Sequence, residues 1–428
     1  MGKVAVVGGG IAGISAAYVL RDHADVTIFE SEHNVGGHAN TIEVSDPTLG
    51  VTLGLDTGFI IYNDASYPEF SGFLRELGVS SDAHRGGFFS FDVDSGIQFG
   101  TAEMDLSEAE VASRFPAEFV DVWSQARRFH QEAPRDFLRK QAEMPLGEYL
   151  SQHGYTREFA EGFVVQLATA VWSMPPRVLW RMPAATFIAF FMAHDAEGLG
   201  GRTVEWKTVS GGSISYVRRA IEAIAPTIRL GETVTSLRGV GDHVVVETST
   251  AQEVFDAVVL ATHADEALRI LVEPTPAQQA INVVEYNMTD CVLHTDPVPV
   301  HGCLERLGSW NFGAGTFDGV RHTWPIYYLN KLQGLSATED YFVTIDYPGH
   351  IDPERVIRRF NYSHPILTVA VRDLQRTVYD AHEDTRVFLA GSYMHSKRLG
   401  PDQIGSHEAA FSSGAVAGRR ALGVLRGG

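Results

Sequence analysis

The chain opens with a short apolar segment of the kind that forms a strand buried on both faces of a sheet. Residues 3–7 (KVAVV) are apolar at every position except the first, and a run of glycines follows directly. Residues 14–20 are mostly apolar and predict a buried helix, and residues 26–29 predict a second strand. This order predicts a strand–turn–helix–strand unit of a parallel sheet.

Two later segments carry a helical pattern. Apolar residues recur at three- and four-residue intervals over residues 105–132 and 145–163, so both segments are expected to be helical. The longest apolar run, residues 186–192 (TFIAFFM), is far shorter than the ~20 residues that span a bilayer. We therefore expect no integral membrane segment.

The glycines after the first strand have the spacing of a dinucleotide-binding turn. Gly8 permits the tight turn, Gly10 permits close approach of a pyrophosphate, and Gly13 permits the helix to pack on the sheet. Glu30 ends the second strand 22 residues after Gly8, where a carboxylate can accept hydrogen bonds from a ribose. An acid there disfavours NADP. The pyrophosphate would lie at the helix N-terminus, against the N–H groups of Ile11 and Ala12.

Composition narrows the class of protein only a little. The 428 residues are 44% hydrophobic, which is enough for a large core and two domains. A net charge of −19 and the lack of a Lys/Arg-rich run exclude nucleic acid as an expected partner. Cys291 and Cys303 have neither a disulfide pattern nor metal-ligand spacing. With the first strand beginning at residue 3, no signal peptide is expected, and we predict a cytoplasmic protein without a metal site.

The segment after Glu30 adds a resemblance to a known superfamily. The doublet Gly36-Gly37 lies six residues past the acid and resembles the second FAD fingerprint of flavin-containing amine oxidases and carotenoid desaturases, with His38 in the place of an Arg. Residues 56–58 (DTG) resemble the turn that this superfamily places beside the flavin ring. Further resemblances follow in the superfamily's order, at residues 206–213, 233–235, 256–262, 388–391 and 408–414.

More narrowly, the chain is similar to a bacterial group of predicted FAD-binding, amine-oxidase-like proteins. The resemblance spans almost the whole length, including residues 54–70, 170–173 and 292–296. It departs at residues 394–404 (MHSKRLGPDQI), an insert that we expect to alter access of the substrate to the flavin. The superfamily usually has an acidic residue after "AG", and this chain has Ser392 at that position.

The resemblance implies an α/β fold. It consists of an FAD-binding Rossmann-like domain of the glutathione-reductase type, a second mixed α+β substrate domain and a helical insertion. The FAD domain would comprise residues 1–75, 203–265 and 384–428, and the substrate domain residues 76–202 and 266–383. The substrate would lie between the isoalloxazine ring and the second domain.

The same resemblance, together with the glycine fingerprint, gives a set of expected site residues. His407, at the start of a helix capped by Ser406, is the candidate catalytic residue, since it could touch the flavin or the substrate. The alternative is that His407 is an ordinary residue of the first helical turn, without a catalytic role. The expected FAD-binding residues are Gly8, Gly10, Ile11, Ala12, Gly13, Glu30, Ser31, Gly36, Gly37, His38, Asp56, Thr57, Gly58, Val234, Ala261, Thr262, Gly391, Ser392, Glu408 and Ala409.

The chemistry expected of such a protein is hydride transfer from an organic substrate to flavin N5, with desaturation of a C–N or C–C bond. Reoxidation by oxygen or another acceptor follows, because the chain has neither a second GxGxxG nor a CxxC. Amine oxidases of this superfamily often carry a lysine near N5; only Lys207 and Lys331 are candidates, and neither position matches.

Two alternatives to this chemistry stay open. One is a redox-neutral or lipid-directed flavoenzyme, which would be a desaturase, saturase or isomerase of acyl or polyketide chains. The other is an NAD-dependent dehydrogenase that uses the first fingerprint alone. Five aromatic residues could line a pocket or pack in the core: Trp172, Trp310, Trp324, Tyr327 and Tyr328.

Overall fold

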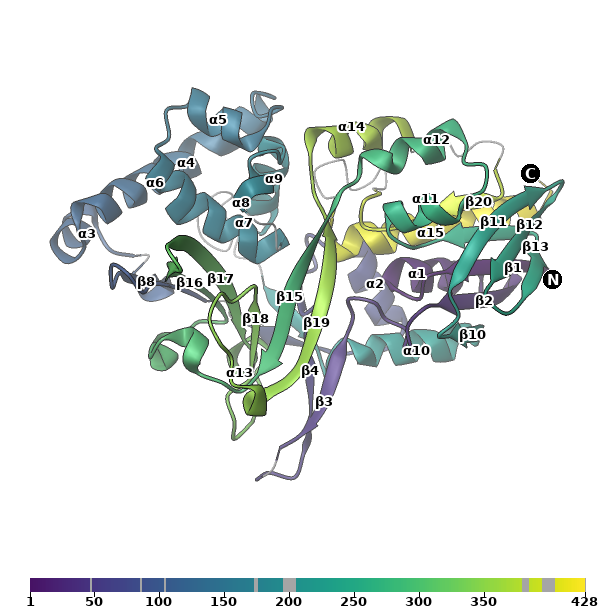
Figure 1. Cartoon of the computed structure of the whole chain (residues 1–428), viewed down its shortest axis with the longest axis horizontal. Coiled ribbons are helices and arrows are strands. Elements are labelled where there is room, and N and C mark those ends of the chain that lie inside the picture. Colours follow the sequence, from purple (N-terminus) through teal and green to yellow (C-terminus); the bar gives the residue numbers. More distant parts are fainter. Residues whose placement is uncertain are drawn as a thin grey trace.

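The structure is a computed structural model, and it describes most of the chain (Figure 1). The described residues are 1–46, 48–84, 87–103, 105–172, 176–194, 205–378, 385–394 and 405–427. Most of the 394–404 segment, in which an effect on substrate access is expected, lies outside this range. Cys291 and Cys303 are buried free thiols, in agreement with their lack of a disulfide pattern in the sequence. Within the described part, no helix is long and apolar enough to cross a membrane.

A five-stranded parallel sheet carries the predicted nucleotide-binding turn. Its strand order is β10-β2-β1-β14-β20, and each neighbouring pair is parallel. The strands come from three distant parts of the chain: β1 (Gly2–Val7), β2 (Ala24–Glu30), β10 (Thr227–Leu230), β14 (Ala257–Leu260) and β20 (Val387–Leu389). Helices α1 (Ile11–Leu20), α10 (Ile214–Ile224) and α15 (His407–Leu425) lie near it in Figure 1. The predicted opening strand–helix–strand unit is confirmed.

Small residues let α1 approach both the first strand and α15 very closely. A Cβ added at Gly13 would lie 1.9 Å from the carbonyl oxygen of Gly8, and one at Gly414 would lie 2.0 Å from that of Ala12. Because real Cβ atoms do not tolerate such distances, both positions require glycine. The role predicted for Gly13, close packing of the helix, agrees with this geometry.

A second sheet of seven strands forms the other half of the molecule. Its order is β19-β15-β18-β17-β16-β7-β8, with only the β16–β7 pair parallel. Its strands are β7 (Phe88–Asp92), β8 (Gln98–Gly100), β15 (Tyr286–His294), β16 (Trp310–Phe317), β17 (Val320–Tyr328), β18 (Phe342–Ile345) and β19 (Val356–Pro365). The long strands β15 and β19 extend from this sheet toward the nucleotide-binding half (Figure 1).

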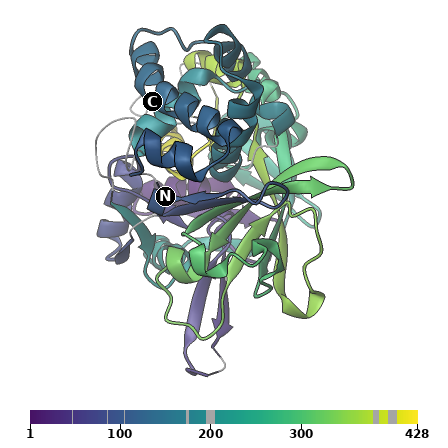
Figure 2. The same cartoon turned by 90° about the vertical axis from the view of Figure 1, so that its left-hand side faces the viewer.

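Helices from residues 108–194 cover one side of the second sheet (Figure 2). They are α3 (Glu108–Arg114), α4 (Ala117–Leu138), α5 (Leu146–Gln152), α6 (Arg157–Phe159), η2 (Ala160–Val164), α7 (Val165–Trp172), α8 (Pro176–Leu179) and α9 (Ala184–His194). The helical character predicted for residues 105–132 and 145–163 is confirmed, and each segment consists of more than one helix. Pro116 caps α4 and separates it from α3, and Gly154, with φ 65°, follows the end of α5.

The remaining elements connect these layers. Strands β3 (Thr41–Ser45) and β4 (Thr52–Asp56) form a projecting hairpin, and β5 (Ile61–Tyr62), β9 (Trp206–Val209) and β6 (Ser81–His84) form a small sheet. A third small sheet contains β11 (Val234–Val240), β12 (His243–Thr248) and β13 (Gln252–Phe255). The other helices are α2 (Pro68–Glu76), α11 (Ala264–Ile270), α12 (Pro276–Gln279), α13 (Leu329–Leu332) and α14 (Val369–Val378).

Candidate active site

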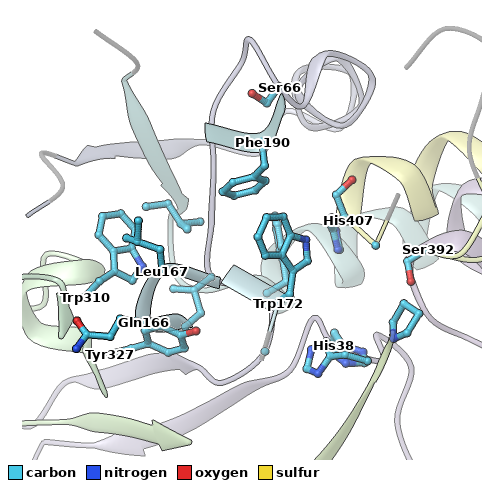
Figure 3. A pocket seen from close by; sticks show the side chains of 18 of the residues that line it. His38, Ser66, Gln166, Leu167, Trp172, Phe190, Trp310, Tyr327, Ser392 and His407 are labelled. Atoms are coloured by element: carbon cyan, nitrogen blue, oxygen red, sulfur yellow. The ribbon is translucent and has the colours of Figure 1, made fainter. Parts of the chain in front are cut away.

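One large cavity runs from the glycine turn of the parallel sheet to the helices that cover the second sheet. Its volume is about 2420 Å³. This exceeds the ~300–1,000 Å³ of ordinary ligand pockets, so the cavity has room for a dinucleotide and a further molecule. Figure 3 shows part of it, with His38, Ser392 and His407 on one side and Gln166, Trp310 and Tyr327 on the other.

The glycine turn and Glu30 are joined by hydrogen bonds into one rigid loop. Gly8 has φ 103°, and its N–H donates to the carbonyl of Phe29 at 2.8 Å. The Gly9 N–H donates to Glu30 Oε2 at 2.7 Å, and the Gly36 N–H donates to the Gly9 carbonyl at 2.9 Å. Glu30 therefore orders the turn in addition to facing the cavity.

The turn leaves open the space that a pyrophosphate needs. A Cβ added at Gly10 would meet no atom of the described residues within 4 Å, in contrast to the crowded Gly13. Gly10 precedes α1, so the helix N-terminus faces this opening. These features fit the diphosphate of FAD. Of the predicted FAD-binding residues, those that line the cavity are Gly8, Gly10, Ile11, Ala12, Glu30, Ser31, Gly36, Gly37, His38, Gly58, Val234, Ala261, Thr262, Gly391 and Ser392.

Five predicted FAD-binding residues do not line the cavity: Gly13, Asp56, Thr57, Glu408 and Ala409. Asp56 is fully buried and joins the β3–β4 hairpin to the start of α10. Its carboxylate accepts from Thr41 Oγ1 at 2.5 Å and from the Ser213 N–H at 2.9 Å. Burial raises the pKa of Asp56 to about 6, although these hydrogen bonds oppose the shift. The contacts of Asp56 are those of a structural residue, whereas the adjoining Gly58 faces the cavity.

Glu408 likewise has structural partners rather than a place in the cavity. Its side chain is fully buried, and its two carboxylate oxygens accept from the N–H groups of Glu69 at 2.8 Å and Phe70 at 2.9 Å. These are first-turn donors of α2, so Glu408 ties the start of α15 to the start of α2. Ser406 caps α15 by accepting from the Ala409 N–H at 3.1 Å, as predicted.

Replacing Glu408 tests this structural role. Glu408→Ala leaves two helix N–H groups buried without that acceptor, so we expect a loss of about 2–4 kcal/mol in the free energy of unfolding. Urea unfolding followed by circular dichroism measures it. The control is Glu148→Ala, which removes an exposed acid from the first turn of α5 and should change stability by less than about 1 kcal/mol. A loss of flavin from Glu408→Ala at unchanged stability would contradict the structural role.

Histidines gather where the two halves of the molecule meet. His38, from the glycine doublet, stacks on Tyr362 of β19 at 4.9 Å and meets the edge of His364 at 5.0 Å. His38 Nε2 and His364 Nδ1 are buried and have no hydrogen-bond partner among the described residues. Burial lowers the pKa of His38 well below its usual value and that of His364 to about 4. Both rings line the cavity as neutral groups, and each has an unused polar atom for a ligand.

His407 occupies the cavity wall at the start of α15. Its ring stacks on Phe59 at 3.7 Å and 8°, and its Nε2 lies 3.1 Å from the hydroxyl of Tyr216. Burial lowers the pKa of His407 to about 3. The imidazole is therefore neutral at physiological pH, and its position fits a role in orienting a ligand.

Beyond the histidines, the cavity continues into an aromatic chamber. We use this name for the part that is lined by Gln166, Leu167, Trp172, Phe190, Trp310 and Tyr327 (Figure 3). Of the five aromatic residues considered from the sequence, Trp324 and Tyr328 lie elsewhere. Trp324 Nε1 donates to the Pro299 carbonyl, and the Tyr328 hydroxyl donates to Asp340.

No lysine is among the described residues that line the cavity. Lys207 forms an ion pair with Asp64 at 2.6 Å, and Lys331 donates to the Leu307 carbonyl at 2.6 Å. Both candidate lysines are therefore occupied outside the cavity. This agrees with the sequence, in which neither position matches the amine oxidase lysine.

Comparison with known proteins identifies the family. The sequence model of the flavin-containing amine oxidoreductases matches residues 11–327, which is most of the chain. The chain therefore belongs to this family, and the enzyme is an FAD-dependent oxidoreductase of amine oxidase type. This finding excludes the alternative of an NAD-dependent dehydrogenase. A search of curated protein sequences finds no match.

Solved structures share the fold at low sequence identity. Cyclohexylamine oxidase from Brevibacterium oxydans IH-35A aligns with a TM-score of 0.68, at 13% identity and over 99% of both chains. Wild-type putrescine oxidase bound to putrescine aligns at 0.65, with 14% identity over 99% of both chains. A CLA-producing fatty acid isomerase from P. acnes aligns at 0.66, with 13% identity over 99% of this chain and 98% of the other. These likenesses confirm the predicted fold class.

Sequence reasoning missed several residues of the cavity wall. His364 and Gln166 lie in segments with no motif, on β19 and α7. Gln166 accepts from the Ser90 hydroxyl at 3.0 Å, which links the helical cover to the second sheet. The β-strand alternation around His364 indicates only which side chains share a face, not that the face borders a cofactor.

Proposed function

We propose that this enzyme removes a hydride from a C–H bond of an organic substrate held in the aromatic chamber, with desaturation of an adjacent C–N or C–C bond. FAD supplies the hydride acceptor, N5, when it is bound. The observation that carries this proposal is the continuity of one cavity from the glycine turn, past His38 and His407, to the aromatic chamber. An aromatic-lined chamber suits hydride transfer, which depends on orientation and exclusion of water more than on a base.

The proposed roles of the residues follow from their positions. Gly8 and Gly10 admit the diphosphate, and Glu30 accepts from the adenosine ribose while its other contacts order the turn. His38 and His364 offer buried polar atoms to the cofactor. His407, fixed by Phe59 and Tyr216, orients the cofactor or substrate.

The domain division is also a proposal. We assign residues 1–75, 203–265 and 384–428 to the FAD domain, and 76–202 and 266–383 to the substrate domain. All five strands of the parallel sheet lie in the first set, and all seven strands of the second sheet lie in the other. We also propose a cytoplasmic location, for which the two unpaired thiols are the support.

An absorption spectrum of the purified protein tests the proposal first. We expect flavin bands, release of FAD on denaturation, and no bleaching by NADH in the absence of oxygen. Primary amines and acyl compounds are then screened for anaerobic bleaching of the flavin. A flavin that no organic donor reduces would contradict hydride removal from the substrate.

A second candidate is a redox-neutral reaction on an acyl or polyketide chain. The lysine-free lining of the described cavity favours it, because the family's amine oxidases often use a lysine near N5. The two candidates differ in their electron balance. Product formation without consumption of oxygen or another acceptor would identify the redox-neutral reaction.

A further inference from the structure

Two buried histidines lie beside the opening in which the diphosphate of FAD is proposed to bind. Gly36 forms an isolated β-bridge with Gly10, and a Cβ added at Gly37 would lie 3.2 Å from Gly10 Cα. The glycine doublet therefore borders the space in front of α1, and His38 follows the doublet directly. The His364 ring lies 5.0 Å from the His38 ring, and both side chains line the same cavity as Gly10. We call His38 and His364 the histidine pair.

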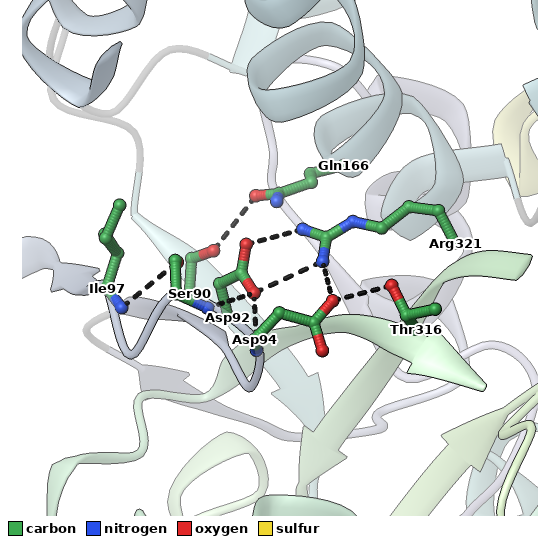
Figure 4. A network of polar contacts seen from close by, with 8 residues as sticks. Ser90, Asp92, Asp94, Ile97, Gln166, Thr316 and Arg321 are labelled. Carbon is green, nitrogen blue, oxygen red and sulfur yellow. Dashed lines mark hydrogen bonds and ion pairs between the residues drawn. The ribbon is translucent and has the colours of Figure 1, made fainter. Parts of the chain in front are cut away.

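A diphosphate carries two negative charges, and the described cavity wall offers no unpaired permanent cation to match them. None of these lining residues is a lysine, and each of the three arginines among them contacts a carboxylate. The pairs are Arg127–Glu108 at 3.2 Å, Arg269–Asp265 at 2.8 Å, and Arg321 with Asp92 at 2.5 Å and Asp94 at 2.8 Å (Figure 4). The N-terminus of α1 supplies only about half a positive charge. The rest of the compensating charge has to come from groups that can gain a proton.

The titratable groups that face the histidine pair are mostly further histidines. They are His263 at the start of α11, His407 at the start of α15 and Tyr362 on β19. The carboxylates on the bordering elements have partners of their own: Glu30 the Gly9 N–H, Asp265 the side chain of Arg269, Glu266 the His263 N–H, and Glu408 the first N–H groups of α2. Burial and repulsion between the histidines lower the pKa of both members of the pair in the protein alone. A bound diphosphate would add the opposite charge, which favours protonation.

We propose that the histidine pair takes up a proton from solvent when the diphosphate of FAD binds, and that the protonated pair then donates to a phosphate oxygen. The inference rests on the FAD site of the proposed function and adds a regulation of that site by pH. The available donors are His38 Nε2 and His364 Nδ1, which are buried without a partner among the described residues. The phosphates of FAD are already fully ionised at neutral pH, so they neither supply nor take up this proton. The affinity for FAD therefore falls as the pH rises.

Release of FAD from the loaded enzyme tests the proton uptake without any substitution. The fluorescence of free FAD after dilution gives the Kd at each pH from about 6 to about 9. Uptake of one proton weakens binding by up to about tenfold per pH unit, and we expect the Kd to rise by at least about tenfold between pH 6 and pH 8. ADP-ribose has the diphosphate but no flavin ring. Its affinity, measured by displacement of FAD, should fall in parallel.

Substitutions of the histidine pair distinguish a ring that gains a proton from a ring that only packs. His38→Gln keeps a hydrogen-bond donor but cannot gain a proton, so it should bind FAD about 10- to 100-fold more weakly than the parent at pH 6 and should approach the parent near pH 9. His364→Gln should behave in the same way. His38→Arg has a permanent charge and should bind FAD more tightly than the parent near pH 9, with a smaller pH dependence. The control is His23→Gln, an exposed position outside the cavity wall, which should follow the parent at every pH.

Three outcomes would overturn the inference: a Kd for FAD that does not change with pH, a pH dependence that FAD shows and ADP-ribose does not, or a loss of affinity in His38→Gln that is equal at pH 6 and pH 9. Binding of FAD requires no substrate, so it is measured independently of the reaction. Proton-linked binding of a flavin that no organic donor reduces would contradict the proposed function alone. A flavin that a donor reduces but that binds without proton uptake would contradict the role of the histidine pair alone.

Discussion

The Gly10→Val variant is expected to fold like the parent protein and to purify without flavin. Gly10 has φ −73° and ψ −178°, which valine adopts readily, and a Cβ there meets no atom within 4 Å in the part of the chain that the structure describes. The added side chain would instead fill the opening in front of α1, where the diphosphate is proposed to lie. The absorption spectrum and the FAD content after denaturation measure the effect, and we expect at least a 100-fold loss of affinity.

Two further variants separate cofactor loss from damage to the fold. Gly239→Val, on β11, places the same side chain where an added Cβ meets nothing within 4 Å, and it should retain FAD. Gly13→Ala should unfold at lower temperature, because its Cβ would lie 1.9 Å from the Gly8 carbonyl oxygen. If Gly10→Val purified with a full complement of FAD, the glycine turn could not be the diphosphate site.

The glycine turn could be predicted from the sequence because its physical requirements are local. Strand, turn and helix follow one another within 20 residues. Gly8 and Gly13 have no room for a Cβ, and Gly10 leaves open the space in front of the helix. The family resemblance extended this prediction to residues distant in the sequence, such as Ala261 and Gly391, which do line the cavity.

The roles of Asp56 and Glu408 could not be predicted in the same way. Both belong to motifs that lie close to the flavin in the superfamily, yet their carboxylates bind backbone N–H groups of α10 and α2, which are distant in the sequence. Motif spacing locates a segment near the cofactor but does not say which side chains of that segment face it. The stacking of His38 on Tyr362 depends equally on a contact between the glycine doublet and β19, which are distant in the sequence.

The stability of the fold is expected to fall in mild acid because of His294. This side chain is fully buried on β15; its Nδ1 accepts from the Asp296 N–H at 3.1 Å, and its Nε2 lies 2.8 Å from Thr344 Oγ1. Burial lowers the pKa of His294 to about 4, against 6.5 for an ordinary histidine. The neutral ring therefore stabilises the folded state fully above pH 6.5, and this contribution is lost as the pH falls toward 4.

A shift of this size corresponds to about 3 kcal/mol between pH 6.5 and pH 4. Urea unfolding measures the free energy of unfolding across that range. Between pH 6.5 and pH 4, this free energy should fall by about 3 kcal/mol less in His294→Gln than in the parent protein. His23→Gln, at an exposed position, serves as the control. An unchanged slope in His294→Gln would show that this ring is not held neutral.

Asp56 should act in the opposite direction over the same pH range. Its folded pKa of about 6 exceeds the ordinary value of 3.8, so the folded state binds a proton that the unfolded chain does not between pH 6 and pH 4. This group therefore stabilises the fold as the pH falls. Asp56→Asn should increase the loss in the free energy of unfolding between pH 6 and pH 4 by about 3 kcal/mol, whereas His294→Gln should reduce this loss. His294 lies on the second sheet and Asp56 on the β3–β4 hairpin. If the two variants change the slope of the free energy of unfolding against pH in opposite directions, the pH dependence arises from individual buried groups rather than from net charge.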